Sequence, residues 1–288
     1  FLCALSRGNF YCCGGVWKRL ECFNIATGEW KTMAPTNAWR DYSAMAAVGR
    51  HLYLCGGQDC ARNVVLRSVE RCDPCSNHGR GRWEVLPCGM LARRQGLAAA
   101  ALDDQRLLVC GGSACCEHMR RIGPQSHDSV EVLDGSAQPL AWRSLPKMLS
   151  ERVKHAVARL GDGVIACGGC DNRNLSIGTC ERYDMETKVW SWLPPMRIAR
   201  DRLSAVVSGG LLYIFGGERA DTRSIDVRVA EYQFNGECYN PALADWQLLF
   251  PREFIAEHPS ARPDHGARPS TDAERESENP WSRTRDRG

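Results

Sequence analysis

One short pattern recurs five times along this chain of 288 residues: a run of apolar residues that ends in two glycines. The copies are FYCCGG ending at Gly15, HLYLCGG at Gly57, LLVCGG at Gly112, VIACGG at Gly169 and LLYIFGG at Gly217. Such runs predict short buried strands, and two glycines predict a bend where backbones crowd together. Because the pattern recurs, we expect an array of similar structural units.

Three further features follow each Gly-Gly in the same order. After a polar loop comes a second kind of strand, at 20–24, 68–74, 129–135, 179–185 and 229–235. Next comes a tryptophan: Trp30, Trp83, Trp142, Trp190 and Trp246. After the first four tryptophans, an apolar-proline turn and a basic residue precede a strand of small residues, as in ERVKHAVARL. Each unit therefore predicts four short strands separated by turns.

The spacing distinguishes a framework from variable loops. Each of the first four tryptophans lies 26 to 28 residues before the next Gly-Gly, whereas the interval from Gly-Gly to Trp varies from 15 to 30 residues. Surface loops tolerate length changes that a framework does not. We therefore expect insertion loops at 74–82, 113–128 and 235–245.

A four-stranded antiparallel sheet that repeats radially packs face against face and leaves only short edges, which is the β-propeller architecture. A series of β-sandwiches is the alternative, but the same roles for Gly-Gly and Trp in every unit argue against it. The order of basic residue, small-residue strand, Gly-Gly, V-E-x-Y-D-like strand and Trp resembles the Kelch repeat over residues 1–250. We therefore predict an all-β, Kelch-type β-propeller of four-stranded antiparallel blades, with five Gly-Gly blades visible as part of a six-bladed ring.

The resemblance implies that each Trp packs between neighbouring blades. Some positions depart from the family pattern in the strand before the Trp. Cys72 and Leu133 stand where an aromatic residue is usual, and Gln233-Phe234 replaces Tyr-Asp in the fifth unit.

Both ends of the chain are expected to be atypical. The chain begins at Phe1 without a Met and is interpreted as a fragment whose first blade lacks its innermost strand. Residues 251–256 either close a five-bladed ring or begin a truncated sixth blade, and His258-Pro259 favours the second. From about Pro259 the chain is rich in Pro, Arg and acidic residues, which predicts a disordered tail. The predicted domains are a propeller at 1–250, with an incomplete first blade, and a strand stub with a disordered tail at 251–288.

Composition argues against several classes of function. The net charge of +3 gives no case for nucleic-acid binding, and no apolar run is long enough to predict a membrane span. Among the sixteen cysteines, four directly precede a Gly-Gly: Cys13, Cys55, Cys110 and Cys167. Equivalent places in a repeat favour buried, reduced thiols in a cytoplasmic protein. The one CxxC, Cys72 to Cys75, has no obvious second pair, so we predict no metal and no cofactor.

The sequence also argues against catalysis. No strand–GxxxxGK–helix arrangement makes the Gly-Gly a phosphate-binding loop, and no two of the seven histidines have metal-ligand spacing on one element. Cys115-Cys116-Glu117-His118 is interpreted as part of a solvated loop. We therefore expect that the chain is not an enzyme, although some kelch-type propellers are oxidases, isomerases or iron-dependent specifier proteins.

The resemblance implies a partner-binding face around the central channel. In related adaptors, contacts come from the basic residue at the innermost strand and from the loop after Gly-Gly. The first set of matching positions is Arg40, Tyr42, Arg94, Arg152, Lys154, Arg200 and Arg202. The second set is Trp17, Lys18, Arg19, Gln58, Asn172, Arg173, Glu218 and Arg219. Several arginines around one opening would favour an acidic or phosphorylated segment. Alternatively, they pair with carboxylates of neighbouring blades, such as Asp41 or Asp201, and support the ring.

The function predicted from this resemblance is that of a protein–protein interaction module. The expected partner is a protein or peptide, with no nucleic acid and no membrane. The most specific prediction is the substrate-recognition propeller of a cullin-type ubiquitin ligase adaptor, which would contact the cullin through a BTB-type domain that this chain does not contain. An actin-associated scaffold and a kelch-type enzyme are the alternatives.

Overall fold

The computed structural model describes residues 2–13, 18–115, 126–220, 230–233 and 235–249. The chain divides into two units, Phe1–Pro251 and Arg252–Gly288, and the second lies outside the described residues. The predicted strand stub at 251–256 and the predicted tail therefore also lie outside them. Within the described residues, no helix has the length and apolar character needed to cross a bilayer.

The described part of the first unit contains five antiparallel four-stranded sheets, which we call blades 1 to 5 in chain order. Blade 1 contains β1 (Leu2–Ser6), β2 (Asn9–Cys13), β3 (Leu20–Asn24) and β4 (Glu29–Thr32). Blade 2 contains β5 (Ala44–Val48), β6 (His51–Cys55), β9 (Val69–Cys72) and β10 (Trp83–Val85). Blade 3 contains β11 (Ala98–Ala101), β12 (Arg106–Cys110), β13 (Val130–Asp134) and β14 (Trp142–Leu145). Blade 4 contains β15 (Ala156–Leu160), β16 (Gly163–Cys167), β17 (Cys180–Asp184) and β18 (Trp190–Leu193). Blade 5 contains β19 (Ser204–Ser208), β20 (Leu211–Phe215), β23 (Gly236–Asn240) and β24 (Asp245–Leu248).

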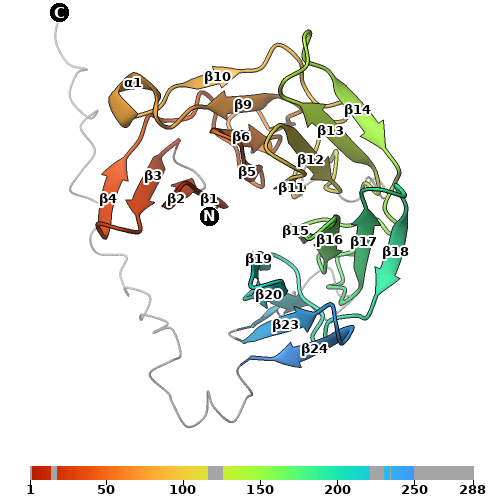
Figure 1. The fold of residues 1–288 in the computed structure, drawn as a ribbon. Coiled ribbons are helices and arrows are strands. Elements are labelled where there is room, and N and C mark those ends of the chain that lie inside the picture. Colours follow the sequence, from red (N-terminus) through yellow and green to blue (C-terminus); the bar gives the residue numbers. More distant parts are fainter. Residues whose placement is uncertain (1, 14–17, 116–125, 221–229, 234, 250–288) are drawn as a thin grey trace, which may run out of the picture. The chain divides into compact units, whose positions relative to one another are not determined.

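Figure 1 shows the blades arranged in chain order around a common centre, with the first strand of each blade innermost and the last outermost. Two small hairpins follow second strands: β7 (Gln58–Asp59) with β8 (Val64–Val65), and β21 (Glu218–Ala220) with β22 (Ala230–Tyr232). One short helix, α1 (Ser76–Gly79), precedes β10. The structure is thus the predicted all-β propeller of four-stranded blades, with five blades seen.

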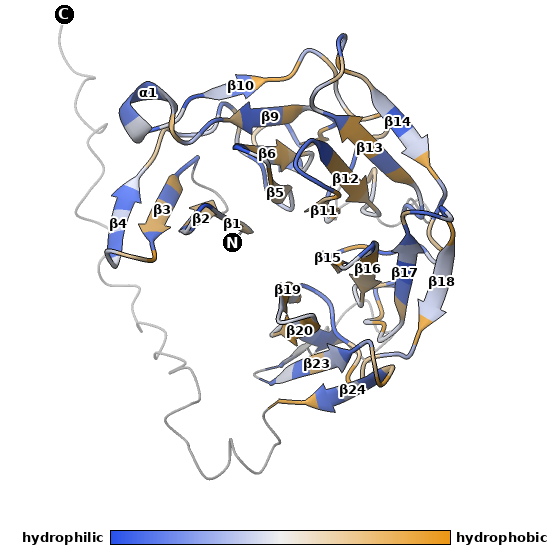
Figure 2. Ribbon diagram, in the orientation of Figure 1, coloured by the Kyte–Doolittle hydropathy of each residue, from blue (hydrophilic) through white to orange (hydrophobic). Residues whose placement is uncertain are grey.

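Apolar character follows the radial order of the strands. All five residues of β16 are buried, and so are four of the five residues in β12, whereas all four residues of β4 are exposed. Figure 2 shows the same gradient, from apolar inner strands such as β6 to hydrophilic outer strands such as β4. Strands β12 and β16 show no alternation because both of their faces pack against another blade, whereas burial alternates along β20 of blade 5.

Four core clusters join the blades in series, each between one blade and the next. The tryptophan at the start of an outer strand packs against the preceding blade, and four of these side chains are buried: Trp83, Trp142, Trp190 and Trp246. The indole N–H of Trp246 donates to the carbonyl of Pro194 at 2.8 Å, and Trp190 donates to Pro146 at 2.9 Å. These carbonyls lie in the apolar-proline turns of the preceding blade. Trp30 is the exception, since it lies in blade 1 and is 58% exposed.

Three of the Gly-Gly pairs join one blade to the next, whereas a Cβ atom at Gly216 would meet nothing within 4 Å. At Gly168 (φ +61°), a Cβ atom would lie 2.6 Å from the carbonyl oxygen of Arg200 in the following blade. The N–H of Gly169 (φ +93°) donates to the same carbonyl at 2.9 Å. Gly111-Gly112 makes the same contacts with Arg152, and Gly56-Gly57 makes them with Arg94. The predicted crowding and bend are therefore confirmed for these pairs, while Gly14-Gly15 lies outside the described residues.

The structure corrects two predictions about strands. Blade 1 does not lack its innermost strand, because Leu2–Ser6 forms β1 and pairs with β2. In the fifth unit, the third strand is not 229–235 followed by a loop at 235–245. Gly236–Asn240 forms that strand, and Tyr239 lies opposite Trp246. Tyr239 is therefore the aromatic residue of the pattern, and the assignment to Gln233-Phe234 was wrong. The sequence signal was present in GECYN, but VAEYQFN resembled it more closely.

Candidate functional site

Every residue of the predicted partner-binding face that the structure describes lies at one end of the blades. The Gly-Gly pairs follow the carboxyl ends of the second strands, and the basic positions precede the amino ends of the first strands. Because these two strands are antiparallel, both segments meet at the same end, as the bridges Asp41↔Gln58 and Asp201↔Glu218 show. We call this end of the molecule the loop face.

Four of the predicted arginines are buried beneath the loop face: Arg40, Arg94, Arg152 and Arg200. Each forms an ion pair with a buried glutamate on the third strand of its own blade. Arg152 Nε lies 2.8 Å from Glu181, and Arg152 also donates to the carbonyls of Gly168 and Thr179. The other pairs are Arg40–Glu70 at 3.0 Å, Arg94–Glu131 at 2.6 Å and Arg200–Glu237 at 2.8 Å.

The glutamates also accept backbone N–H groups. Glu237 accepts hydrogen bonds from Arg197 at 2.7 Å and from Ile198 at 3.1 Å, and Glu70 accepts them from Asn37 and Ala38. Each arginine thus connects the first three strands of its blade, with its charge balanced by a glutamate of that blade. The alternative that arginines support the ring therefore applies to these four. However, their partners are glutamates of the same blade, and not Asp41 or Asp201 of a neighbouring blade.

A chain of backbone hydrogen bonds crosses the blades at the loop face. The residue two positions after each buried arginine has a left-handed conformation: Tyr42 (φ 52°), Gly96 (φ 61°), Lys154 (φ 58°) and Arg202 (φ 56°). Gly96 N donates to Tyr42 O at 2.7 Å, Lys154 N donates to Gly96 O at 2.7 Å, and Arg202 N donates to Lys154 O at 2.8 Å. Left-handed backbone at non-glycine residues costs free energy. It recurs here because these residues make the hydrogen bonds between blades, and we call this chain of hydrogen bonds the joint.

Three side chains from different blades meet at this joint. Lys154 Nζ lies 5.4 Å from the centre of the Tyr42 ring, and the Arg202 guanidinium lies 6.0 Å from it. Both distances are typical of cation–π interactions. Tyr42 is 38% exposed, the Arg202 side chain is 36% exposed, and Lys154 is buried. Arg202 also donates to Glu218 at 2.7 Å. We call Tyr42, Lys154 and Arg202 the central cluster.

The remaining predicted residues lie around this cluster or outside the described part of the chain. Arg173 is exposed in the loop after Gly168-Gly169, with its Nε 3.3 Å from Asp171, and Arg219 lies in β21. Gln58 and Glu218 are buried, whereas Asn172 is exposed. Lys18 donates to the carbonyl of Asn37, and Arg19 pairs with Glu21. Trp17 lies outside the described residues.

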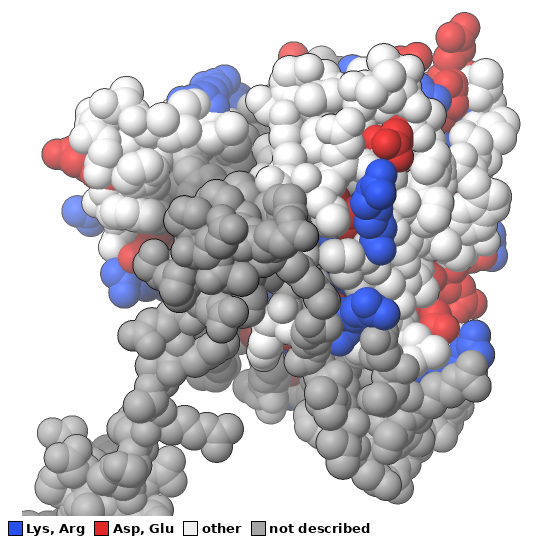
Figure 3. Space-filling model, turned by 90° about the horizontal axis from the view of Figure 1, so that it is seen from below, with Lys and Arg blue, Asp and Glu red and all other residues white. Residues whose placement is uncertain are grey.

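The charges of the described surface are mixed. In Figure 3, which is turned by 90° from the view of Figure 1, basic and acidic side chains are scattered among uncharged residues on the side shown. The net charge of +3 is consistent with this distribution. A charged partner would therefore be recognised by local groups at the loop face, and not by the field of the whole protein.

The cysteines and histidines in the described ranges do not assemble into a group of three or more potential metal ligands. Cys55 and Cys110, which precede Gly-Gly pairs, are fully buried, and burial raises the pKa of each thiol to about 12. Cys110 Sγ lies 3.3 Å from His155 Nε2. Burial, assisted by Arg152 and Arg94, lowers the pKa of His155 to about 3. This pair is therefore a neutral imidazole beside a neutral thiol, and both side chains are shielded from solvent.

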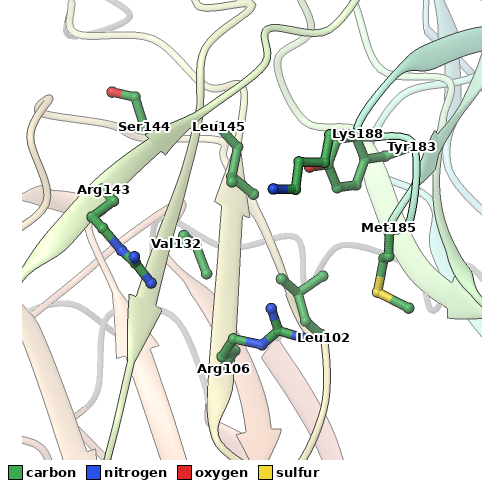
Figure 4. Close-up of a pocket in the computed structure, with 9 residues that line it drawn as sticks. All are labelled: Leu102, Arg106, Val132, Arg143, Ser144, Leu145, Tyr183, Met185 and Lys188. Atoms are coloured by element: carbon green, nitrogen blue, oxygen red, sulfur yellow. The ribbon is translucent and has the colours of Figure 1, made fainter. Parts of the chain in front are cut away.

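A cavity of about 300 Å³ lies between blades 3 and 4, at the opposite end from the loop face. Arg106, which lines it, begins β12, whereas the Gly-Gly pair follows the end of that strand. Figure 4 shows Arg106, Arg143 and Lys188 around apolar residues that include Leu102, Val132 and Leu145. Arg106 also pairs with Asp103 at 2.6 Å. An exposed arginine far from the loop face provides a control position for binding experiments.

Comparisons with known proteins agree with the repeat and the fold. Residues 151–197 match the Kelch motif. The chain is 24% identical over 231 residues to Kelch-like protein terF of Aspergillus terreus, covering 78% of this chain and 47% of that protein. It is 24% identical over 245 residues to human Kelch-like protein 25, covering 82% of this chain and 37% of that protein.

The chain thus spans less than half the length of these curated relatives. Among solved structures, "Structure of YjhT" superposes with a TM-score of 0.74 at 15% identity, over 85% of this chain and 82% of that one. That likeness concerns the fold alone. The described part of the chain is thus a β-propeller of five blades, which contains a Kelch motif at residues 151–197 and is similar to Kelch-like proteins over most of its length.

Proposed function

We propose that this propeller is a protein-interaction module that binds a protein or peptide through the loop face. The central cluster is the observation that carries the proposal. Three blades contribute one aromatic and two cationic side chains to one place, so the cluster forms only when the propeller is assembled. A tyrosine ring combined with an arginine is a frequent composition of the energetically dominant part of an interface.

The partner segment is proposed to be acidic or phosphorylated. Arg202 supplies a partly exposed guanidinium at the centre, Lys154 adds a buried positive charge beside the Tyr42 ring, and Arg173 and Arg219 extend the basic character into the loops after Gly-Gly. Guanidinium groups bind carboxylates and phosphates with two parallel hydrogen bonds. The four buried arginines are not part of this proposed contact surface, because their donors already serve the glutamates and carbonyls of their own blades.

In the whole protein, we propose that the propeller recognises the substrate of a cullin-type ubiquitin ligase. The matches to Kelch-like proteins, which extend well beyond the matched segment, support a propeller that works together with another part of a longer chain. The cullin would be contacted by a BTB-type domain, and the propeller would hold the client.

Affinity purification from the native cell, with mass spectrometry of the retained proteins, tests this proposal. The bait is the full-length protein, compared with a Lys154→Asn/Arg202→Asn variant and with Arg106→Gln as the control at the opposite end. Asparagine tolerates the left-handed backbone, so the double variant removes both charges without forcing the joint apart.

We expect cullin and ubiquitin components with all three baits, and a client that the double variant retains at least about ten-fold less. Retention of every client by the double variant would contradict binding through the central cluster. Recovery of chaperones alone would contradict the adaptor role. The melting temperature of each bait verifies that the propeller is folded.

A further inference from the structure

Two cysteines face each other across the first hairpin of blade 1. Cys3 in β1 is paired directly with Cys12 in β2, and their Sγ atoms are 3.2 Å apart. Both cysteines are free thiols in the structure. Sulfur atoms this close need to approach by only about 1.2 Å to reach the length of a disulfide bond.

The backbone geometry of this pair suits a disulfide. Directly opposed residues of antiparallel strands have Cα atoms about 4.5 or 5.5 Å apart, depending on the kind of pair. Both separations lie within the range of about 4.4 to 6.8 Å that disulfides require. The bond can therefore form without a change in strand register.

The pair is also accessible to solvent. Ala4, Tyr11 and Cys13 point into the core between blades 1 and 2, so the alternate residues Cys3 and Cys12 lie on the other side of the sheet. Cys3 is exposed and Cys12 is half-buried. A small disulfide in solution can thus reach at least one of the two thiols.

Blade 4 provides an internal comparison. Cys167 and Cys180 are also directly opposed, in β16 and β17, but only 1% and 0% of their surfaces are exposed. The two pairs share their cross-strand arrangement and differ in access to solvent. Only the pair in blade 1 combines close opposition with exposure among the cross-strand cysteine pairs of the described residues.

We propose that Cys3 and Cys12 form a reversible disulfide by exchange with a small-molecule disulfide such as oxidised glutathione. The thiolate of one cysteine attacks the glutathione disulfide, which forms a mixed disulfide and releases one glutathione thiolate. The thiolate of the second cysteine then attacks the protein sulfur of the mixed disulfide and releases the second glutathione. The two protons lost by the cysteines are taken up by the two glutathione thiolates, so glutathione disulfide is reduced and the cysteine pair is oxidised.

The disulfide would tie the innermost strand of blade 1 to its neighbour. The folded hairpin holds the thiols together, so folding favours the bond, and by linkage the bond favours the folded hairpin. Blade 1 would therefore resist unfolding more strongly under oxidising conditions than under reducing ones.

Titration of the full chain with glutathione redox buffers tests the proposal. After each equilibration, free thiols are blocked with N-ethylmaleimide and the chain is digested with trypsin. Cleavage after Arg7 and Lys18 separates a peptide containing Cys3 from peptide 8–18, which contains Cys12 and Cys13. A disulfide between them is read as one linked species that dithiothreitol splits.

We expect the linked species in the wild type and in Cys13→Ser, and its loss in Cys12→Ser and in Cys3→Ser. We also expect the equilibrium constant for its formation to be at least about ten-fold lower in urea, because the unfolded chain no longer holds the thiols together. Cys167 and Cys180 should remain modifiable only after unfolding.

Two results would overturn the proposal. One is a folded wild type in which Cys3 and Cys12 both still react with N-ethylmaleimide at glutathione redox potentials that oxidise the same two thiols in the urea-unfolded chain. The other is a linked species that persists in Cys12→Ser, which would assign the bond to Cys13. Because Cys3 is exposed, Cys3→Ser keeps the test valid if Cys12→Ser fails to fold.

Discussion

Position relative to solvent divides the basic residues of this propeller into two kinds. Four arginines are buried and form ion pairs within their own blades: Arg40, Arg94, Arg152 and Arg200. In contrast, Arg202 and Arg173 keep part of their side chains exposed at the loop face. The residue types are the same, so the difference lies in their surroundings. A buried guanidinium is stable only when a carboxylate and further acceptors surround it.

The Arg152–Glu181 pair predicts a large loss of stability upon truncation. Arg152→Met should lower the free energy of unfolding by about 3–5 kcal/mol, because it leaves Glu181 buried without its counter-charge. Urea unfolding of the purified protein measures this. The control is Arg159→Met, since Arg159 is exposed on β15 of the same blade, and it should change the free energy by less than about 0.5 kcal/mol. If both substitutions lowered the free energy of unfolding equally, the buried ion pair would not stabilise the blade more than an exposed arginine does.

Because His155 is buried and neutral, we expect the protein to lose stability as the pH falls. Its pKa is about 3 in the folded protein and near 6.5 when unfolded, so the unfolded state binds more protons between these values. The contribution of neutral His155 is therefore fully present above about pH 6.5 and is lost as the pH falls toward 3. Between these pKa values, the free energy of unfolding should fall by up to about 1.4 kcal/mol for each pH unit of acidification.

Urea unfolding of the wild type and of His155→Gln at pH 7, 6, 5 and 4 measures this dependence. The wild type should lose stability relative to the variant at each step below pH 6.5. Parallel curves for the two proteins would mean that His155 binds its proton equally well in the folded and unfolded states, which contradicts a lowered pKa in the folded protein.

At the scale of elements, the glycine pair does more than end a strand. It lets the second strand of one blade approach the arginine segment of the next, and it donates a hydrogen bond across that boundary. The tryptophans act at the outer side of the same boundary through the proline turns. The boundaries between blades 2 and 3, 3 and 4, and 4 and 5 are thus joined near the centre by glycine and near the rim by tryptophan.

Two glycines of blade 4 separate the effect of crowding from that of backbone conformation. Gly161 and Gly168 have nearly equal φ values of +60° and +61°, but a Cβ atom at Gly161 meets nothing within 4 Å. Gly161→Ala should lower the free energy of unfolding by about 1 kcal/mol, through the left-handed backbone alone. Gly168→Ala should lower it by about 3 kcal/mol or more, because its Cβ also collides with the Arg200 carbonyl. Thermal or urea unfolding compares the two, and equal losses would contradict a tight inter-blade contact at Gly168.

At the scale of the whole molecule, the blades form a series in which burial is uneven. Strands β12 and β16 lie between neighbouring blades and are almost wholly buried. In contrast, β4 is exposed along its length, and β20 contains Phe215 at 39% exposure. Local stability follows the number of buried apolar contacts that a segment must break to open.

Hydrogen exchange followed by mass spectrometry should therefore show a gradient through the propeller. Amides of β12 and β16 should exchange slowest, by at least about ten-fold relative to β4 and β20. Uniform exchange of all five blades would indicate a single cooperative unit in which position within the series has no effect. The same experiment after glutathione oxidation should slow exchange in β1 and β2 only.

Much of the fold could be predicted from the sequence, because each blade repeats the same local requirements. Apolar runs, glycine pairs and tryptophans recur at nearly constant spacing, and these patterns determined the four-stranded units, the propeller and the buried cysteines. The predictions failed where two segments fit one pattern: VAEYQFN was favoured over GECYN as the third strand of blade 5. Local pattern cannot decide between them, since the choice depends on which segment brings Glu237 to Arg200 and Tyr239 to Trp246.

Only the tertiary structure decided which individual side chains are buried and which partners they contact. The arginines and their glutamates are 29 to 37 residues apart in the sequence, and nothing in that spacing shows that they are buried together. The central cluster unites Tyr42, Lys154 and Arg202 from three blades, and Cys3 meets Cys12 through strand register. By itself, the sequence determined which units form, because their patterning is local. Which charges are buried and which remain available depends on long-range packing, because only packing brings a distant carboxylate or ring within a few ångströms.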